Sequence, residues 1–314
     1  MNRAMKKSIV YCLLVVCLGF SFSACDKEDD YLVIDTRTYS VQQSMLKVWL
    51  EYLCSSECEG RKSGTVGNER AREYIVSELK RMSYAPLMQE AVDEQKRTYY
   101  NIIVHAGGDE SRPTIVIGAH YDGAVESSNY PAANDNASGV ASLLLLAHML
   151  ADSDTDFPYN YQLVFFDGEE TQTGGTSFNG SRFFVSALEE PPLFYLNIDM
   201  IGNAEMLHRI ETTSDYLADC VLKIGEKYER LELEVDNKIV KYSQDFVPFD
   251  AVDIPVFTWK NPLNSNQGKY NHTPEDQLKY LSLEKMEIIT NINFELITYP
   301  FSEDIYKNNR STRD

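Results

Sequence analysis

The chain has 314 residues, of which 43% are hydrophobic, and a formal net charge of −19 from 48 acidic and 29 basic residues. Because binding to nucleic-acid phosphates requires a positively charged surface, this balance disfavours a nucleic-acid partner. The length is within the range of one large α/β domain and requires no second domain.

The first residues have the charged, apolar and small-residue order that is typical of a secretory signal. The apolar run over residues 9–20 is shorter than the roughly 20 residues that a membrane-spanning helix needs. Ser23-Ala24 before Cys25 resembles a bacterial lipobox, and the alternative is an ordinary cysteine of a signal peptide. We predict a signal peptide over residues 1–24 and a tether over residues 25–40, anchored through a lipid on Cys25.

An acidic run directly follows Cys25. This run, Asp26-Lys27-Glu28-Asp29-Asp30, resembles the tag of surface lipoproteins in some Gram-negative bacteria, and a solvated linker is the alternative. The expected location is therefore the outer membrane of a Gram-negative bacterium, facing the periplasm or the surface, with membrane contact only through the lipid. The sequence leads to no prediction of oligomeric state.

Helical and strand patterns alternate through the rest of the chain. Apolar residues at helical spacing predict helices, and short β-branched or apolar runs between turn residues predict strands. In chain order these are helices over 41–53 and 68–82, strands over 101–104 and 114–117, a helix over 138–151, a strand over 161–166, a helix over 181–188, a strand over 193–198, a helix over 216–231, a strand over 256–259 and a helix over 283–299.

This alternation predicts the fold class. Strands and helices with short connections indicate a single α/β domain over residues 41–314, with a mostly parallel mixed β-sheet covered by helices on both faces. Such sheets place their sites beyond the carboxyl ends of the strands. Polar residues that follow the predicted strands are therefore the first candidates for function.

The first two candidates follow one strand and precede one helix. His120 and Asp122 are two residues apart, so on an extended chain they share a side, where His120 can bind zinc while Asp122 orients it or a neighbouring ligand. The alternative is a structural hydrogen-bonded pair. Asp135 lies in Asn134-Asp135-Asn136 before an apolar helix, where it can reach a cation or serve only as a helix cap.

Adjacent carboxylates end the next strand. Glu169 and Glu170 would repel each other unless a cation neutralises them or their side chains diverge. Successive side chains do diverge, so Glu170 can bind a metal while Glu169 faces the water that the metal holds. A solvated acidic loop is the alternative.

Two further candidates come from later segments. Asp199 ends an apolar strand, where an unpaired carboxylate would be costly, and His272 lies in a loop after the strand that ends near Trp259. The five candidate ligands are suited to zinc because they combine nitrogen and oxygen donors. Two zinc ions balance three carboxylates and one hydroxide if Asp135 bridges them. The full set is His120, Asp135, Glu170, Asp199 and His272.

Taken together, these motifs resemble those of the bacterial zinc aminopeptidase family that uses two co-catalytic zinc ions. The resemblance covers roughly residues 60–276 and rests on His-x-Asp, Asn-Asp-Asn-x-Ser-Gly, Glu-Glu, Asp-Met-Ile-Gly and His-Thr-Pro-Glu-Asp in this order. It implies that the five candidates bind two zinc ions, with Asp135 bridging and Asp122 in a supporting position. It also implies removal of N-terminal residues from peptide substrates by a metal-bound hydroxide, with Glu169 as the general base.

Two departures keep other functions open. Relatives carry Tyr directly before the last His, whereas this chain has Asn271 there and Tyr270 one step earlier, so the oxyanion donor is not assigned. The phrase Phe165-Phe166-Asp167-Gly168-Glu169-Glu170 also resembles glutaminyl cyclases, which share the scaffold and form N-terminal pyroglutamate. The alternatives are therefore a glutaminyl cyclase, a carboxypeptidase or a non-catalytic peptide-binding surface protein.

Overall fold

The computed structural model of this chain describes residues 39–109, 111–170, 177–204, 208–228, 233–236, 244–260, 270–302 and 305. The predicted signal peptide and Cys25 lie outside these residues. All of the described residues belong to one compact unit, residues 39–314. Among them, no helix has the length and apolar character needed to cross a membrane.

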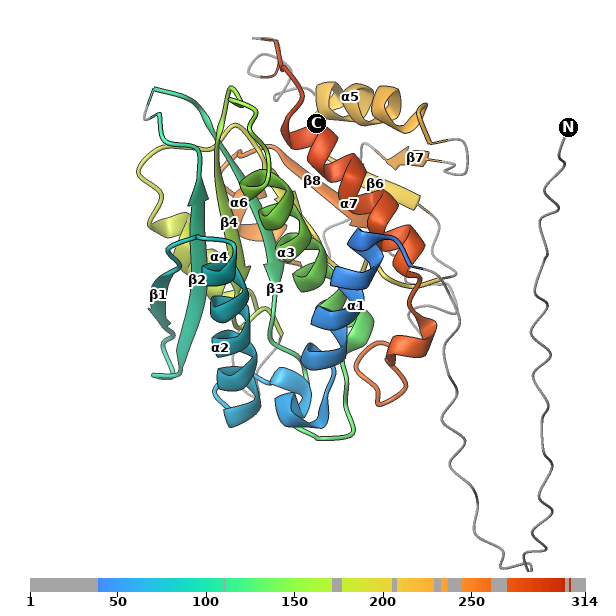
Figure 1. Cartoon of the computed structure of the whole chain (residues 1–314). Helices are drawn as coiled ribbons and strands as arrows, with labels where there is room; N and C mark the ends of the chain where they lie inside the picture. Colours follow the sequence, from blue (N-terminus) through green and yellow to red (C-terminus); the bar gives the residue numbers. More distant parts are fainter. Residues whose placement is uncertain are drawn as a thin grey trace, which may run out of the picture. The chain divides into compact units, whose positions relative to one another are not determined.

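An eight-stranded mixed sheet runs through the middle of the molecule (Figure 1). Its central strands β4, β3, β5 and β8 are parallel neighbours, while β1, β2 and β6 join by antiparallel pairing. The parallel centre confirms the predicted fold class. In spatial order the strands are β1 (Leu87–Val92), β2 (Thr98–Ala106), β4 (Asn160–Phe166), β3 (Thr114–His120), β5 (Tyr195–Asn197), β8 (Val256–Lys260), β6 (His208–Thr212) and β7 (Leu233–Asp236).

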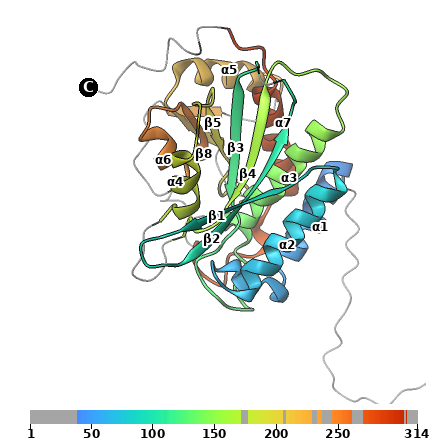
Figure 2. The same cartoon turned by 90° about the vertical axis from the view of Figure 1, so that its left-hand side faces the viewer.

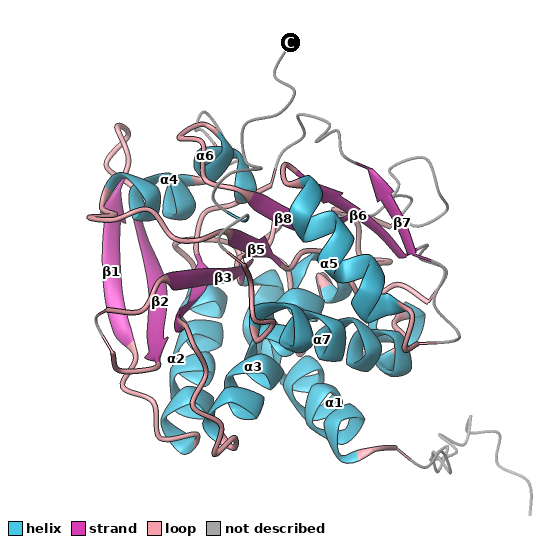
Figure 3. Ribbon diagram, turned by 90° about the horizontal axis from the view of Figure 1, so that it is seen from above, coloured by secondary structure: helices cyan, strands magenta, loops and turns pink. Residues whose placement is uncertain are grey.

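Helices cover both faces of this sheet, as Figure 2 and Figure 3 show from two directions. Alternate residues of one strand point to opposite faces. In β3, Ile115 and Ile117 therefore join the larger core, and Val116 joins the smaller one. The larger core packs under α1 (Val41–Leu53), α2 (Val66–Arg81), α3 (Ser138–Ala151), α5 (Asp215–Gly225) and α7 (Leu283–Ile297), and the smaller core under α4 (Asn179–Ser186) and α6 (Phe246–Asp250).

Three strands, the short helix α6 and several element boundaries differ from the prediction. The sequence did not indicate β1, β6 or β7; β1 is an edge strand whose residues are mostly exposed, so it lacks a hydrophobic pattern. The helix predicted over 216–231 ends at Gly225, where the missing side chain leaves room for Leu233. The helix predicted over 181–188 begins two residues earlier, at Asn179. Cys54, Cys58 and Cys220 are free thiols.

Gly118 of β3 is a position where an added methyl group would disturb the sheet beside the site. A Cβ there would lie 2.5 Å from Phe166 Cε2 and 2.6 Å from the Tyr195 hydroxyl, both fully buried. We expect Gly118→Ala to lower the free energy of unfolding by about 1–3 kcal/mol, the usual effect of overpacking. Urea unfolding followed by circular dichroism measures this change.

Gly108→Ala is the matched control for this prediction. A Cβ at Gly108 has no atom within 4 Å, so its effect should stay within about 0.5 kcal/mol. Equal unfolding midpoints for the two variants would show that the aromatic side chains around Gly118 move aside at no cost.

Candidate active site

The predicted ligands come together at the carboxyl edge of the central strands. His120 is the last residue of β3, Asp199 follows β5 by two residues, and Glu170 follows β4 by four. Asp135 lies in the turn before α3, and His272 lies in the segment between β8 and α7. Convergence at this edge agrees with the position that parallel sheets give to their sites.

The first group of possible metal ligands is His120, Asp135 and Asp199, which are all buried. His120 Nε2 lies 3.3 Å from Asp135 Oδ1 and 3.5 Å from Asp199 Oδ1. One nitrogen and two carboxylate oxygens thus face a common point, as a zinc ion requires.

The second group is Asp135, Glu170 and His272. His272 Nε2 lies 3.2 Å from Asp135 Oδ2 and 3.1 Å from Glu170 Oε2. The His272 side chain is 51% exposed, so this group opens toward solvent. The two groups share Asp135, whose Oδ1 faces one histidine and whose Oδ2 faces the other.

The charges of these buried groups favour a bound cation. Burial and the neighbouring Asp135 carboxylate raise the pKa of Glu170 to about 7, and burial also raises the pKa of Asp199. Hydrogen bonds to Asp135 and Glu170 raise the pKa of His272 to about 10. Crowded carboxylates thus shift one another and the nearby histidines, and a divalent cation would offset this repulsion. The residues present therefore fit the zinc ions that the sequence predicts.

Glu169 lies beside these groups with 8% of its surface exposed. Burial raises its pKa well above the usual value, and the carboxylates of Glu170 and Asp245 act in the same direction. Asp245 is itself buried, with 1% of its surface exposed. A carboxylate with a raised pKa is suited to accept a proton near neutral pH.

Asp122 supports both the first histidine and the adjacent glutamates. Its Oδ1 accepts the N–H of Glu169 at 3.1 Å, and its Oδ2 accepts the N–H of Glu170 at 3.2 Å. His120 Nδ1 lies 3.2 Å from the Asp122 carbonyl oxygen and 3.6 Å from Oδ1. Asp122 therefore fixes the backbone that carries Glu169 and Glu170, in addition to contacting the histidine ring.

The polar residues around Asp135 are tied to the segment that carries Asp199. Asn134, Asn136 and Ser138 each form a hydrogen bond with a main-chain group of residues 198–202. The hydrogen bonds run from Gly202 N to Asn134 Oδ1 (2.9 Å), from Met200 N to Asn136 Oδ1 (3.1 Å), from Asn136 Nδ2 to Ile198 O (3.0 Å) and from Ile201 N to Ser138 Oγ (3.1 Å).

The sequence left open that Asp135 serves only as a helix cap, but Asn136 has that role. The N-cap position of α3 is Ala137, which offers no side-chain acceptor, and Asn136 Oδ1 accepts the N–H of Gly139 at 2.9 Å. Asn136 thus acts as the cap while Asp135 faces the two histidines.

Sequence reasoning missed Arg61 as a residue of the site. Arg61 is fully buried, and its guanidinium donates hydrogen bonds to four main-chain carbonyls. Two acceptors, Pro131 and Ala132, precede the turn of Asp135, and a third, Tyr121, follows His120 directly. The fourth is Leu53 at the end of α1. The sequence signal was limited to its place at the start of the region that the resemblance covers, residues 60–276, because a buried arginine has no pattern of its own.

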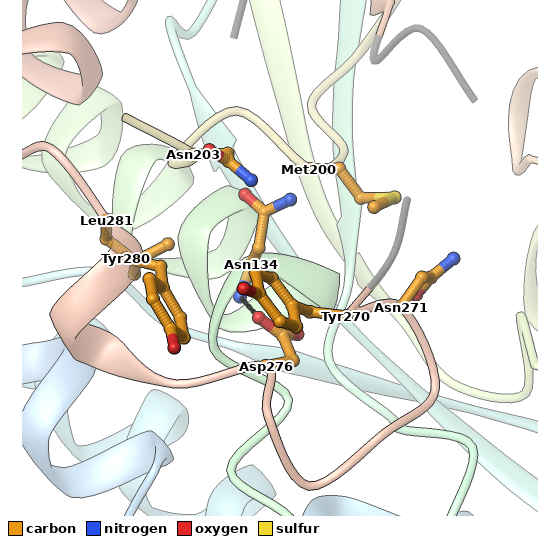
Figure 4. Close-up of a pocket in the computed structure, with 8 residues that line it drawn as sticks. All are labelled: Asn134, Met200, Asn203, Tyr270, Asn271, Asp276, Tyr280 and Leu281. Atoms are coloured by element: carbon orange, nitrogen blue, oxygen red, sulfur yellow. Dashed lines mark hydrogen bonds between the residues drawn. The ribbon is translucent and has the colours of Figure 1, made fainter. Parts of the chain in front are cut away.

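Asp276 was also missed as a functional residue. It is 4% exposed, and its carboxylate accepts the main-chain N–H groups of Asn134 at 2.8 Å and Asp135 at 3.0 Å. The hydrogen bond to Asn134 is drawn in Figure 4. The quoted motif included Asp276, but its partner lies 141 residues away in sequence, so no local pattern indicated the contact.

A small pocket adjoins the second group (Figure 4). The Tyr270 and Tyr280 rings stack at one side, with centroids 4.6 Å apart and planes 8° apart. Asn271, which takes the place of the expected tyrosine before His272, lines this pocket too. The other lining residues are Asn134, Met200, Asn203, Asp276 and Leu281.

Comparisons with known proteins give a family match and several relatives. A family model described as Peptidase family M28 matches residues 101–297, which include all five predicted ligands. Aminopeptidase YwaD of Bacillus subtilis is 29% identical over 190 residues, covering 56% of this chain and 38% of that protein. The chain spans less than half the length of the curated relatives that it matches.

Solved structures share the fold at low sequence identity. A zinc aminopeptidase from Bacillus subtilis superposes with a TM-score of 0.69 at 16% identity, covering 85% of this chain and 97% of that structure. A Porphyromonas gingivalis glutaminyl cyclase superposes with a TM-score of 0.66 at 17% identity, covering 82% and 96%. The fold is therefore common to peptidases and cyclases, and function has to be argued from the site.

Proposed function

This chain belongs to Peptidase family M28, and from that premise we propose that it is a zinc-dependent aminopeptidase. The main support for this proposal is that Asp135 belongs to both groups of candidate ligands. Its Oδ1 lies 3.3 Å from His120 Nε2 and its Oδ2 lies 3.2 Å from His272 Nε2, so one carboxylate completes both groups. These residues would hold two zinc ions rather than one, with Asp135 contributing one oxygen to each.

The residues that would hold each ion follow from the two groups. His120, Asp135 and Asp199 would bind one zinc ion, and Asp135, Glu170 and His272 would bind the second. Zinc, when bound, lowers the pKa of water to about 7 and polarises a carbonyl group. Asp122 keeps Glu169 and Glu170 in place through their backbone N–H groups.

Glu169 is the proposed general base. Its carboxylate accepts the proton from the attacking water and then donates that proton to the leaving amine, so that one residue serves as base and acid in turn. Burial raises its pKa, which is the direction that suits a group that accepts a proton. The exposure of the His272 side chain supports entry of a peptide at the second group.

An aminoacyl anilide assay tests the proposal. We expect the zinc-loaded protein to release the aniline, to lose this activity on treatment with a chelator and to regain it when zinc is added. Release of ammonia from an N-terminal glutaminyl peptide, without anilide cleavage, would instead identify a glutaminyl cyclase. Cleavage of C-terminal residues would identify a carboxypeptidase, and binding without turnover would identify a peptide-binding protein.

A further inference from the structure

The turn that carries Asp135 cannot satisfy its own main-chain donors. Ala132 has a φ of 49°, and Asp135 has φ and ψ of −114° and 90°, so this turn departs from helical geometry directly before α3. A buried N–H group without an acceptor costs about as much free energy as a lost hydrogen bond. The N–H groups of Asn134 and Asp135 therefore depend on an acceptor from another segment.

Asp276 is that acceptor, and it holds the turn at three points. Its two carboxylate oxygens accept the N–H groups of Asn134 and Asp135 at 2.8 and 3.0 Å, and its carbonyl oxygen accepts the N–H of Ala133 at 3.2 Å. The two carboxylate oxygens of Asp122 likewise accept the N–H groups of Glu169 and Glu170. One buried carboxylate thus holds the backbone of Asn134-Asp135, and another holds the backbone of Glu169-Glu170.

Asp276 also belongs to the segment that supplies His272. Its N–H donates to the Thr273 carbonyl at 3.1 Å, and the Thr273 N–H donates to the Tyr270 carbonyl at 3.1 Å, so successive turns connect the two residues. The contact between Asp276 and Asp135 therefore sets the separation of Asp135 and His272. That separation, 3.2 Å between Oδ2 and Nε2, defines the second group of ligands.

The first group is fixed by other contacts. Asn136 ties the turn to Ile198 and Met200 on either side of Asp199, and Arg61 ties it to the Tyr121 carbonyl next to His120. Loss of the Asp276 contact leaves these hydrogen bonds in place. The two groups are thus positioned by separate sets of side chains, although they share Asp135.

We propose that Asp276 is a positioning residue for the second metal site, and that it sets the affinity of that site without setting the affinity of the first. This inference rests on the proposed two-zinc function. The substitution Asp276→Asn keeps one acceptor oxygen but turns an NH₂ group toward a main-chain N–H, so one donor would face another. The carboxylate of Asp135 would then lose its fixed distance to His272.

Zinc titration of the purified full chain tests this inference. The dissociation constants of both ions are measured by competition with a chromogenic chelator, and the zinc content is measured by mass spectrometry. His272→Ala, which removes a ligand of the second group, identifies the constant of the remaining first site. In Asp276→Asn we expect the second ion to bind about 10- to 100-fold more weakly, the usual effect of removing a group that orients a ligand. The first constant should equal that of wild type.

Two further variants make the result decisive. Asp276→Glu keeps a carboxylate but moves it by one methylene group. This variant should fold, and its affinity for the second ion should fall less than that of Asp276→Asn. Glu78→Gln alters another buried carboxylate, one bonded to Trp49 and Arg81, and should leave both constants unchanged. Thermal melting of the metal-free proteins separates loss of fold from loss of affinity.

The outcomes separate this inference from the proposed function. If wild type fails to bind two zinc ions, the proposed function is wrong. If wild type binds two ions and the Asp276 variants bind both with unchanged constants, only the positioning role is wrong. Equal weakening of both ions, in parallel with a lower melting temperature of the metal-free protein, would also overturn it.

Discussion

Replacing Glu169 with glutamine is expected to lower kcat for anilide hydrolysis by about 100- to 10,000-fold, the range that general base catalysis contributes. The amide cannot accept the proton of the attacking water, so the loss should appear in kcat rather than in KM. Glu169 is outside both groups of metal ligands, so the variant should retain the zinc content of wild type. Steady-state kinetics and metal analysis on the same sample measure both quantities.

Glu189→Gln is the matched control, because it makes the same chemical change at an exposed position. It should have wild-type kinetics. Unchanged hydrolysis in Glu169→Gln would remove Glu169 from the mechanism, and loss of zinc from that variant would make it a ligand instead of a base.

Replacing Asp135 with asparagine is expected to have the largest effect on metal binding, because one side chain serves both groups. Replacing a residue that only orients a ligand lowers metal affinity by about 10- to 100-fold. Removal of this shared carboxylate should lower the affinity for both ions by more than that. Hydrolysis should fall with the zinc content. Zinc titration of the metal-free protein measures the two constants.

Asp199→Asn provides the comparison for Asp135→Asn. Asp199 belongs to the first group alone, so its replacement should weaken one ion and leave the other bound through Asp135, Glu170 and His272. If the two variants lose the same amount of zinc, Asp135 does not bridge. Melting curves of the metal-free variants check that the turn around residue 135 still folds.

The predictions for the N-terminus rest on the sequence alone. The signal peptide over residues 1–24, the lipid anchor on Cys25 and the outer-membrane location concern residues outside the described part of the chain. They remain predictions, and they are independent of the catalytic proposal.

Much of the fold was predictable because its central elements have strong hydrophobic patterns. Buried strands such as β3 and β4 are nearly continuous apolar runs, and α3 begins and ends at the predicted residues. The edge strand β1 was not predicted because most of its residues are exposed, so burial leaves no alternation to detect. Pairing with β2 through main-chain hydrogen bonds, and not side-chain pattern, makes it a strand.

The sequence by itself determined the identity of the candidate ligands, because abrupt changes from apolar strands to carboxylates and histidines are local features. Only the tertiary structure decided how they divide into two groups, with the oxygens of Asp135 facing His120 and His272 separately. It also decided that Arg61 and Asp276 hold the turn of Asp135. These contacts join segments about 70 to 140 residues apart, and they depend on loop conformations that no short sequence pattern encodes.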